Sequence, residues 1–214
     1  MPSRESTAQL LVEGKNDQHV IWALCKQHNV EETFTVETPN NDSGGIGSLL
    51  NSIPVRLKIP RLKALGIVLD ADQNLEARWQ SLRSRLEESG YNNLPISPNA
   101  DGIIIYIPEK PKVGVWIMPN NRLPGILENF VAHLIPEGDE LVPKVENILQ
   151  DIENDSLNRY PFNKRPKAFI HTWLAWQETP GQPMGQAITA HALNHLAPIA
   201  TSFVDWLRRL FGEA

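Results

Sequence analysis

Two short apolar segments that each end in carboxylates constrain this chain more than any other feature. One segment precedes Glu13 and Asp17, and the other, further along the chain, precedes Asp70 and Asp72. Short uncharged segments are typical of strands that are buried on both faces of a parallel sheet. Ligands of an open α/β sheet bind just beyond the carboxyl ends of its strands. If the two strands are parallel neighbours, the four acidic side chains meet there.

The four carboxylates predict a site for a divalent cation. Uncompensated carboxylates that lie close together repel one another and raise each other's pKa. A hard cation with oxygen ligands compensates them, and Mg²⁺ or Mn²⁺ suits this ligand set. Residues two apart in an extended backbone face the same side, so we expect the side chains of Asp70 and Asp72 to point together.

The order of the expected elements indicates an α/β fold. We expect strands over residues 8–12, 34–37, 65–69, 102–107 and 113–118, and helices over residues 17–28, 46–56, 75–89, from about 126, 137–155, 169–177, 184–196 and 198–211. The last two strands form an antiparallel hairpin, and Asn16 is the expected N-cap of the first helix. The sheet should be mostly parallel with helices on both faces. We expect this core over residues 1–135, with residues 136–214 as a helical extension packed on it.

Composition and charge narrow the class of protein. The chain has 214 residues and 41% hydrophobic residues, enough for one domain with a proper core. A net charge of −5 argues against a generally basic nucleic-acid coat, although a local basic groove remains compatible with it. The single cysteine, Cys25, excludes an internal disulfide and fits a reducing cytoplasm. We expect neither a signal peptide nor a membrane span, since no apolar segment approaches the ~20 residues that a span needs.

Three weaker patterns also suggest binding sites. Residues 38–48 are rich in glycine, hydroxyl and amide groups and could hold a phosphate, but their spacing matches no P-loop and a turn is the plainer interpretation. The basic residues of segment 56–63 form either a strip for a polyanion or a solvated helix end. His191 and His195 have a zinc-binding spacing, yet no third ligand accompanies them.

Two motifs resemble the Toprim domain, which topoisomerases, bacterial primases and nucleases of the overcoming-lysogenization-defect type share. They are Leu-Val-Glu-Gly-Lys-Asn-Asp at residues 11–17 and Val-Leu-Asp-Ala-Asp at residues 68–72. A looser likeness covers residues 125–128 and 167–175, and the chain as a whole is most similar to small stand-alone Toprim-like bacterial proteins. The resemblance implies a compact Rossmann-like sheet with helices on both faces and an acidic Mg²⁺ site.

The resemblance also assigns roles to the four acids at the strand ends. Glu13 matches the family's glutamate, which is linked to acid–base catalysis or metal binding. Asp70 and Asp72 match its metal-binding pair, and Asp17 matches an additional acid of the nuclease-like branch.

Two later residues match the family more loosely. Glu128 corresponds to a later acidic metal ligand, and Lys167 to a basic residue that stabilises the transition state. Neither a topoisomerase tyrosine domain nor a primase zinc-binding domain is expected, because one cysteine cannot build the latter. Strand passage and primer synthesis are therefore not expected of this chain alone.

These features favour Mg²⁺-dependent hydrolysis of phosphodiesters in DNA or RNA. Two cations about 4 Å apart can stabilise an attacking water and a leaving oxygen together, and a lysine beside the phosphate offsets developing charge. One alternative is a non-catalytic Toprim-like module that binds nucleic acid or protein, which the negative net charge favours. Another is a sugar-nucleotide transferase that uses Asp70 and Asp72. Such an enzyme needs a nucleotide pocket at the first strands, where Glu13 and Asp17 are poorly suited to a diphosphate. Aromatic residues in the C-terminal helices also allow a homo-oligomer.

Overall fold

The fold is built on one five-stranded sheet. The computed structural model describes residues 7–39 and 45–212. Its strands are β1 (Ala8–Leu11), β2 (Thr35–Glu37), β3 (Ala64–Asp70), β4 (Ile103–Ile105) and β5 (Lys112–Met118), in the order β2-β1-β3-β5-β4. The first three neighbouring pairs are parallel, and the hairpin of β4 and β5 is antiparallel. The prediction of a mostly parallel α/β sheet is confirmed.

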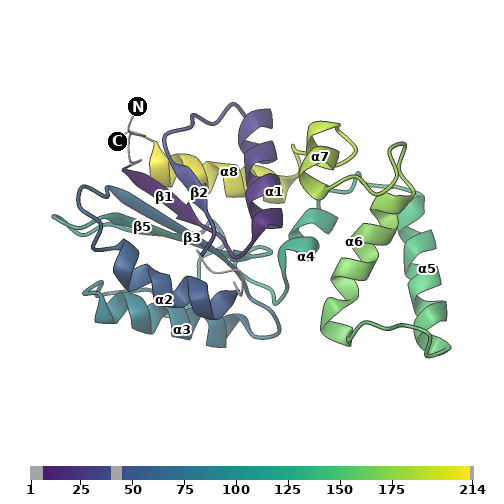
Figure 1. Ribbon diagram of the computed structural model, residues 1–214, viewed down its shortest axis with the longest axis horizontal. Helices are drawn as coiled ribbons and strands as arrows, with labels where there is room; N and C mark the ends of the chain where they lie inside the picture. The colour runs from purple at the N-terminus through teal and green to yellow at the C-terminus, as the bar shows by residue number, and fades with distance from the viewer. Residues whose placement is uncertain (1–6, 40–44, 213–214) are drawn as a thin grey trace.

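Helices cover both faces of this sheet. They are α1 (Lys15–Gln27), α2 (Ile46–Arg56), α3 (Leu75–Glu88), α4 (Leu127–Ala132), α5 (Leu141–Asn154), α6 (Arg165–Ala175), α7 (Met184–Thr189) and α8 (Pro198–Phe211), with a 3₁₀ turn, η1, at Phe162–Lys164. Figure 1 shows α2 and α3 on one face, and α1 and α8 on the other. The buried side chains form two clusters accordingly, one on each side of the sheet.

The C-terminal helix α8 packs directly on the centre of the sheet. Gly66 in β3 and Gly114 in β5 make this approach possible, because a Cβ atom at Gly114 would lie 2.4 Å from Cδ2 of Leu210. A Cβ at Gly66 would lie 3.0 Å from the same atom. The helix therefore completes one wall of the core, and its side chains belong to the same buried cluster as those of β1 and α1.

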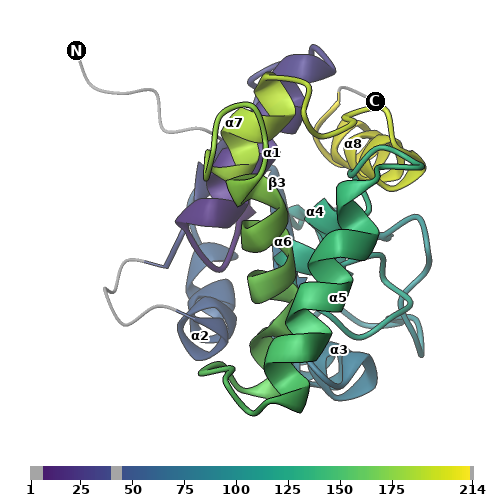
Figure 2. The ribbon, with the colours of Figure 1, turned by 90° about the vertical axis from the view of Figure 1, so that its right-hand side faces the viewer.

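The helices α4, α5 and α6 lie beyond the sheet, on the side where the parallel strands end. Figure 1 places them to the right of the strands, and Figure 2 looks at the molecule from their side. This arrangement puts the helices opposite the strand ends that carry the acidic residues.

No helix among residues 7–39 and 45–212 is long and apolar enough to cross a membrane.

Several helix boundaries differ from those expected; the helix α5, for example, begins at Leu141, four residues later than expected. The helix α1 begins at Lys15 with Gly14 as its N-cap, not Asn16, because Asp17 Oδ2 accepts a hydrogen bond from the Gly14 backbone N–H (3.1 Å) and closes the first turn. The helix α6 begins at Arg165, four residues earlier than expected, because a proline in its first turn favours a helix start. The helix α7 ends early, because His191 takes a left-handed conformation (φ 61°).

Candidate metal centre

Hydrogen bonds join three separate segments at the carboxyl edge of the sheet. Oε1 of Glu13, just after β1, accepts a hydrogen bond from the backbone N–H of Asp70 at the end of β3 (2.8 Å). Oδ1 of Asp70 in turn accepts one from the backbone N–H of Leu127 in the first turn of α4 (2.9 Å). Two distant parts of the sequence therefore deliver their carboxylates to one place, because β1 and β3 are parallel neighbours.

All six residues expected at the site line one cavity of about 490 Å³, which we call the acidic cavity. They are Glu13, Asp17, Asp70, Asp72, Glu128 and Lys167. The cavity also contains Lys15 and Lys164, which we did not assign to the site from the sequence. The structure thus brings the expected acids together with a small group of lysines.

Burial and mutual repulsion act strongly on the carboxylates of the acidic cavity. Burial, followed by the negative charges of Glu13 and Asp17, raises the pKa of Asp70 to about 9. Burial and the charge of Glu13 raise the pKa of Asp17 to about 7. Burial also raises the pKa of Glu13, against the opposing hydrogen bond from Asp70. The protein alone therefore does not compensate the charges that it gathers here.

Glu128 is the most deeply buried acid of the group. It is only 1% exposed, and its Oε1 pairs with Nζ of Lys167 at 2.6 Å. Its second oxygen, Oε2, is buried without a hydrogen-bond partner among the described residues. Buried polar atoms are almost always hydrogen-bonded, so this oxygen can accept a bond from a water molecule or a ligand.

The backbone conformation and side-chain position of Asp72 differ from those predicted. The strand β3 ends at Asp70, and Asp72 has a left-handed backbone conformation (φ 51°), so the two residues do not share an extended backbone. The side chain of Asp72 is half exposed and forms an ion pair with Arg78. Arg78 also donates from Nε to the backbone carbonyl of Asp70 (2.8 Å). Asp72 therefore lies at the rim of the acidic cavity, with its charge already compensated.

Apart from Lys167, the cations at the site were not predicted from the sequence. Arg78 lies in the first turns of the helix that follows Asp72, and this proximity was the available signal. Lys164 lies far along the chain, on the 3₁₀ turn before α6, and only the packing of that turn near the strand ends brings it to the cavity. No local pattern around Lys164 indicates that placement.

The acids share a cavity but are not yet arranged as ligands. Among the described residues, no group of three or more Asp, Glu, His or Cys side chains is in position to hold a metal ion. The local contacts give the reason: Glu13 and Asp70 each use one oxygen for a backbone N–H, and Glu128 is turned to Lys167. A bound cation would therefore compete with these contacts.

One family model matches residues 7–212, almost the entire chain, and its description is "Protein of unknown function (DUF3226)". The chain belongs to the DUF3226 family. No curated protein and no solved structure matches it.

Two of the three weaker patterns lie outside the acidic cavity of this DUF3226 protein, whereas Gly45 of the expected phosphate loop lines it. The rings of His191 and His195 lie 5.2 Å apart between centroids, and neither residue lines the acidic cavity. The ring nitrogen Nε2 of His28 contacts the carbonyl of His195 (2.8 Å). In the basic segment, Arg56 pairs with Glu37 and therefore carries no free charge for a polyanion. Residues 40–44 of the expected phosphate loop lie outside the described residues.

Proposed function

We propose that this protein is a Mg²⁺-dependent phosphodiesterase that hydrolyses nucleic acid on a Toprim-like fold. The observation that carries the proposal is the gathering of carboxylates from the β1–α1 segment, β3 and α4 in one cavity, with Oε2 of Glu128 unpaired among the described residues. The two motifs that resemble the Toprim domain supply the acids at both strand ends. Lysines on the same cavity wall give a phosphate group its counter-charge.

The chemistry of the donors suits a hard divalent cation. Every acidic group of the cavity offers oxygen, the ligand that Mg²⁺ and Mn²⁺ prefer. The raised pKa values of Asp17 and Asp70 mean that a positive charge placed among them would be stabilised. We therefore propose Glu13, Asp17, Asp70 and Glu128 as the residues that hold the ion, with Asp72 at the rim.

Glu13 is placed to act on a water molecule. Its Oε1 is held by the backbone N–H of Asp70, which fixes the side chain and leaves Oε2 to accept a proton. In the metal-free protein burial raises its pKa, and a cation bound among the neighbouring acids would lower it again; the role of base therefore rests on the position of Oε2. When bound, Mg²⁺ supplies Lewis-acid stabilisation of the charge that develops on a phosphodiester.

Lys167 is placed to receive the phosphate. Its side chain is 42% exposed although its partner Glu128 is buried, so the ammonium group lies at the border between the cavity and solvent. Glu128 would offer its carboxylate to a bound cation, and the ammonium group of Lys167 would stabilise the negative charge of the phosphoryl oxygens. Lys15 and Lys164 line the same cavity and add positive charge to it.

The proposal is tested by a cleavage assay with labelled DNA and RNA in the presence of Mg²⁺, Mn²⁺ or EDTA. We expect cleavage that requires the metal and that is lost in Glu13→Gln and Asp70→Asn. The matched controls are Glu88→Gln and Asp151→Asn, since both residues are exposed and lie on helices away from the cavity. Cleavage that persists in either cavity variant contradicts the proposal.

A second function is favoured by the internal ion pairs. Lys167 with Glu128 and Arg78 with Asp72 neutralise part of the site within the protein, as expected of a module that binds nucleic acid or a protein without turnover. Calorimetric titration with Mg²⁺ followed by the cleavage assay separates the two functions. Nucleic-acid binding that needs no metal and leads to no cleavage supports the module.

A further inference from the structure

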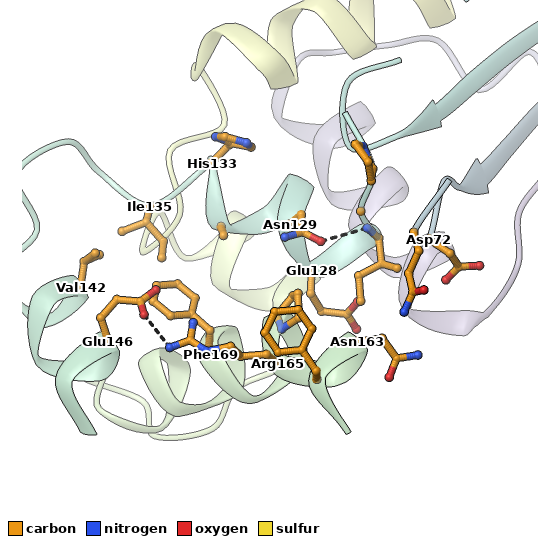
Figure 3. A pocket seen from close by; sticks show the side chains of 17 residues that line it. Asp72, Glu128, Asn129, His133, Ile135, Val142, Glu146, Asn163, Arg165 and Phe169 are labelled. Atoms are coloured by element: carbon orange, nitrogen blue, oxygen red, sulfur yellow. Dashed lines mark hydrogen bonds and ion pairs between the residues drawn. The ribbon is translucent and has the colours of Figure 1, made fainter. Parts of the chain in front are cut away.

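A second cavity opens directly beside the acidic cavity. It has a volume of about 760 Å³ and lies between the segment before α4 and the helices α4, α5 and α6. Asp72, Ile126 and Glu128 line both cavities, so the two are adjacent. Figure 3 shows its labelled side chains running from Asp72 at one end, past Glu128 and Asn129, to Val142 and Glu146 on α5 at the other. We call it the flank pocket.

An exposed aromatic side chain stands at the flank pocket. Phe162 is 86% exposed, the highest value for a large hydrophobic residue in the described part of the chain. It lines the pocket from the 3₁₀ turn η1, two residues before Lys164 of the acidic cavity. A phenylalanine that contributes nothing to the core offers a flat apolar face to a ligand, and this one lies next to a lysine assigned to phosphate binding.

The charges of the flank pocket disfavour a second phosphate there. Its one arginine, Arg165, is already paired with Glu146 (2.8 Å) and Glu153 (2.9 Å). Glu128 and Asp72, where the two cavities meet, are likewise paired, with Lys167 and Arg78 respectively. An anionic group would therefore find no free cation among these residues, whereas a neutral ring needs none.

The remaining lining suits a flat ring that carries polar edges. Ile135, Val142 and Phe169 supply apolar surface, and Asn129 and Asn163 supply amide groups. Ligand sites typically combine a mainly apolar wall with a few polar groups in a volume of about 300–1,000 Å³. A nucleoside has this character, and a nucleoside next to a phosphate is the repeating unit of the proposed substrate.

We propose that the flank pocket binds one unpaired nucleobase of the strand whose phosphate lies in the acidic cavity, with Phe162 stacking on the base. This inference rests on the proposed function for the position of the phosphate. A base inside a duplex is paired and stacked, and therefore out of reach of such a pocket unless it is extruded. The substrate class is accordingly single-stranded nucleic acid or an unpaired end.

The test compares the full-length chain with Phe162→Ala and Phe162→Trp by fluorescence anisotropy. The probes are labelled oligothymidylate, a strand of the same length made only of abasic units, and a duplex of that length. Leu157→Ala is the matched control, because Leu157 is also an exposed apolar residue but does not line the pocket. Thermal melting checks that Phe162→Ala is folded. We expect its melting temperature to equal that of the wild type, because the side chain of Phe162 is exposed.

We expect Phe162→Ala to weaken oligothymidylate binding by roughly 10-fold or more, the effect of losing one stacked base. Phe162→Trp and Leu157→Ala should bind it as the wild type does. The abasic strand should bind more weakly than oligothymidylate and should not distinguish Phe162→Ala from the wild type, and the duplex should bind more weakly than oligothymidylate. Equal binding of the wild type and Phe162→Ala to oligothymidylate overturns the inference. So does a change of oligomeric state in Phe162→Ala with no change in binding, since it makes Phe162 a contact between copies of the chain.

The two proposals fail in different ways. If the chain cleaves nucleic acid but Phe162→Ala binds and cleaves as the wild type does, the metal site stands and the base pocket is overturned. If no cleavage occurs under any metal condition while Phe162→Ala still loses affinity for oligothymidylate alone, the base pocket stands and the proposed catalysis fails.

Discussion

Two groups of charged side chains lie close together in this protein and differ in how their charges are balanced. In the first, between α5 and α6, Arg165 pairs with Glu146 and Glu153, and the hydroxyl of Tyr160 donates to Glu153 (2.8 Å). We call these four residues the Arg165 cluster. Although desolvation opposes it, these hydrogen bonds lower the pKa of Glu153. Each charge of this cluster has a partner within the protein.

The acidic cavity shows the opposite balance. Its acids are more numerous than the cations that contact them, and burial together with mutual repulsion raises the pKa of Asp70 to about 9 and that of Asp17 to about 7. A cluster of charged side chains with a purely structural role is expected to be balanced, as the Arg165 cluster is. A group that remains unbalanced costs stability, and this cost is expected where a site awaits a ligand.

The largest expected effect separates the two groups by activity. On the proposed function, Glu13→Gln removes the base and should lower the rate of cleavage by about 10²–10⁴-fold. Glu153→Gln in the Arg165 cluster should leave the rate unchanged, because Glu153 lies outside the acidic cavity. Initial rates of cleavage at saturating Mg²⁺ compare the two variants with the wild type. Equal losses in both variants would mean that the acidic cavity has no special role.

The second effect is the response to metal. Mg²⁺ at about 100 times its Kd should stabilise the folded wild type by about 2.7 kcal/mol. The stabilisation should be larger at about pH 8.5 than at about pH 6, because protons compete with the cation for Asp17, whose pKa is about 7, and for Asp70.

Thermal melting with and without Mg²⁺ at the two pH values measures this response. Glu153→Gln should respond as the wild type does, and Asp70→Asn should not respond. A metal response that is equal at both pH values, or that survives in Asp70→Asn, would place the cation elsewhere.

The contrast also shows how much of the site can be predicted from the sequence. The acids after the two apolar segments were predictable, because uncharged segments mark buried strands and parallel neighbours end at the same edge. The left-handed backbone conformation of Asp72 was not predictable, since it accompanies a bridge between Asp72 and the distant Gly125. Lys164 and Phe162 reach the site only through the packing of η1 and α6 beyond the sheet, which no local periodicity encodes.

The third effect is on stability without metal. The pKa of Asp70 is higher in the folded protein than the ordinary value of 3.8, so the folded state binds its proton more tightly than the unfolded state does. Its contribution to stability is therefore present at low pH and falls as the pH rises from about 4 towards 9. Asp70→Asn cannot ionise, and its Oδ1 can still accept the hydrogen bond from Leu127.

Asp70→Asn should therefore be more stable than the wild type at about pH 8 in EDTA, by roughly 1–3 kcal/mol. The difference should shrink towards about pH 4, where the wild-type side chain is protonated in the folded state. Urea denaturation at both pH values measures it, with Asp151→Asn on the surface of α5 as the control. A variant that is less stable than the wild type at pH 8 would show that the carboxylate of Asp70 is compensated within the protein.

The smallest effect has the opposite sign and belongs to the Arg165 cluster. The lowered pKa of Glu153 means that its ionised form is favoured by folding, so its stabilisation is present above the ordinary pKa of 4.5 and is lost as the pH falls through the folded value. Glu153→Gln should melt slightly below the wild type at neutral pH, and the two should converge in strong acid. High salt should reduce the difference, since the pairs are partly exposed to solvent. If Glu153→Gln instead became more stable as the pH rose, the cluster would behave like the acidic cavity, and its balanced charges could no longer serve as the reference for an unbalanced site.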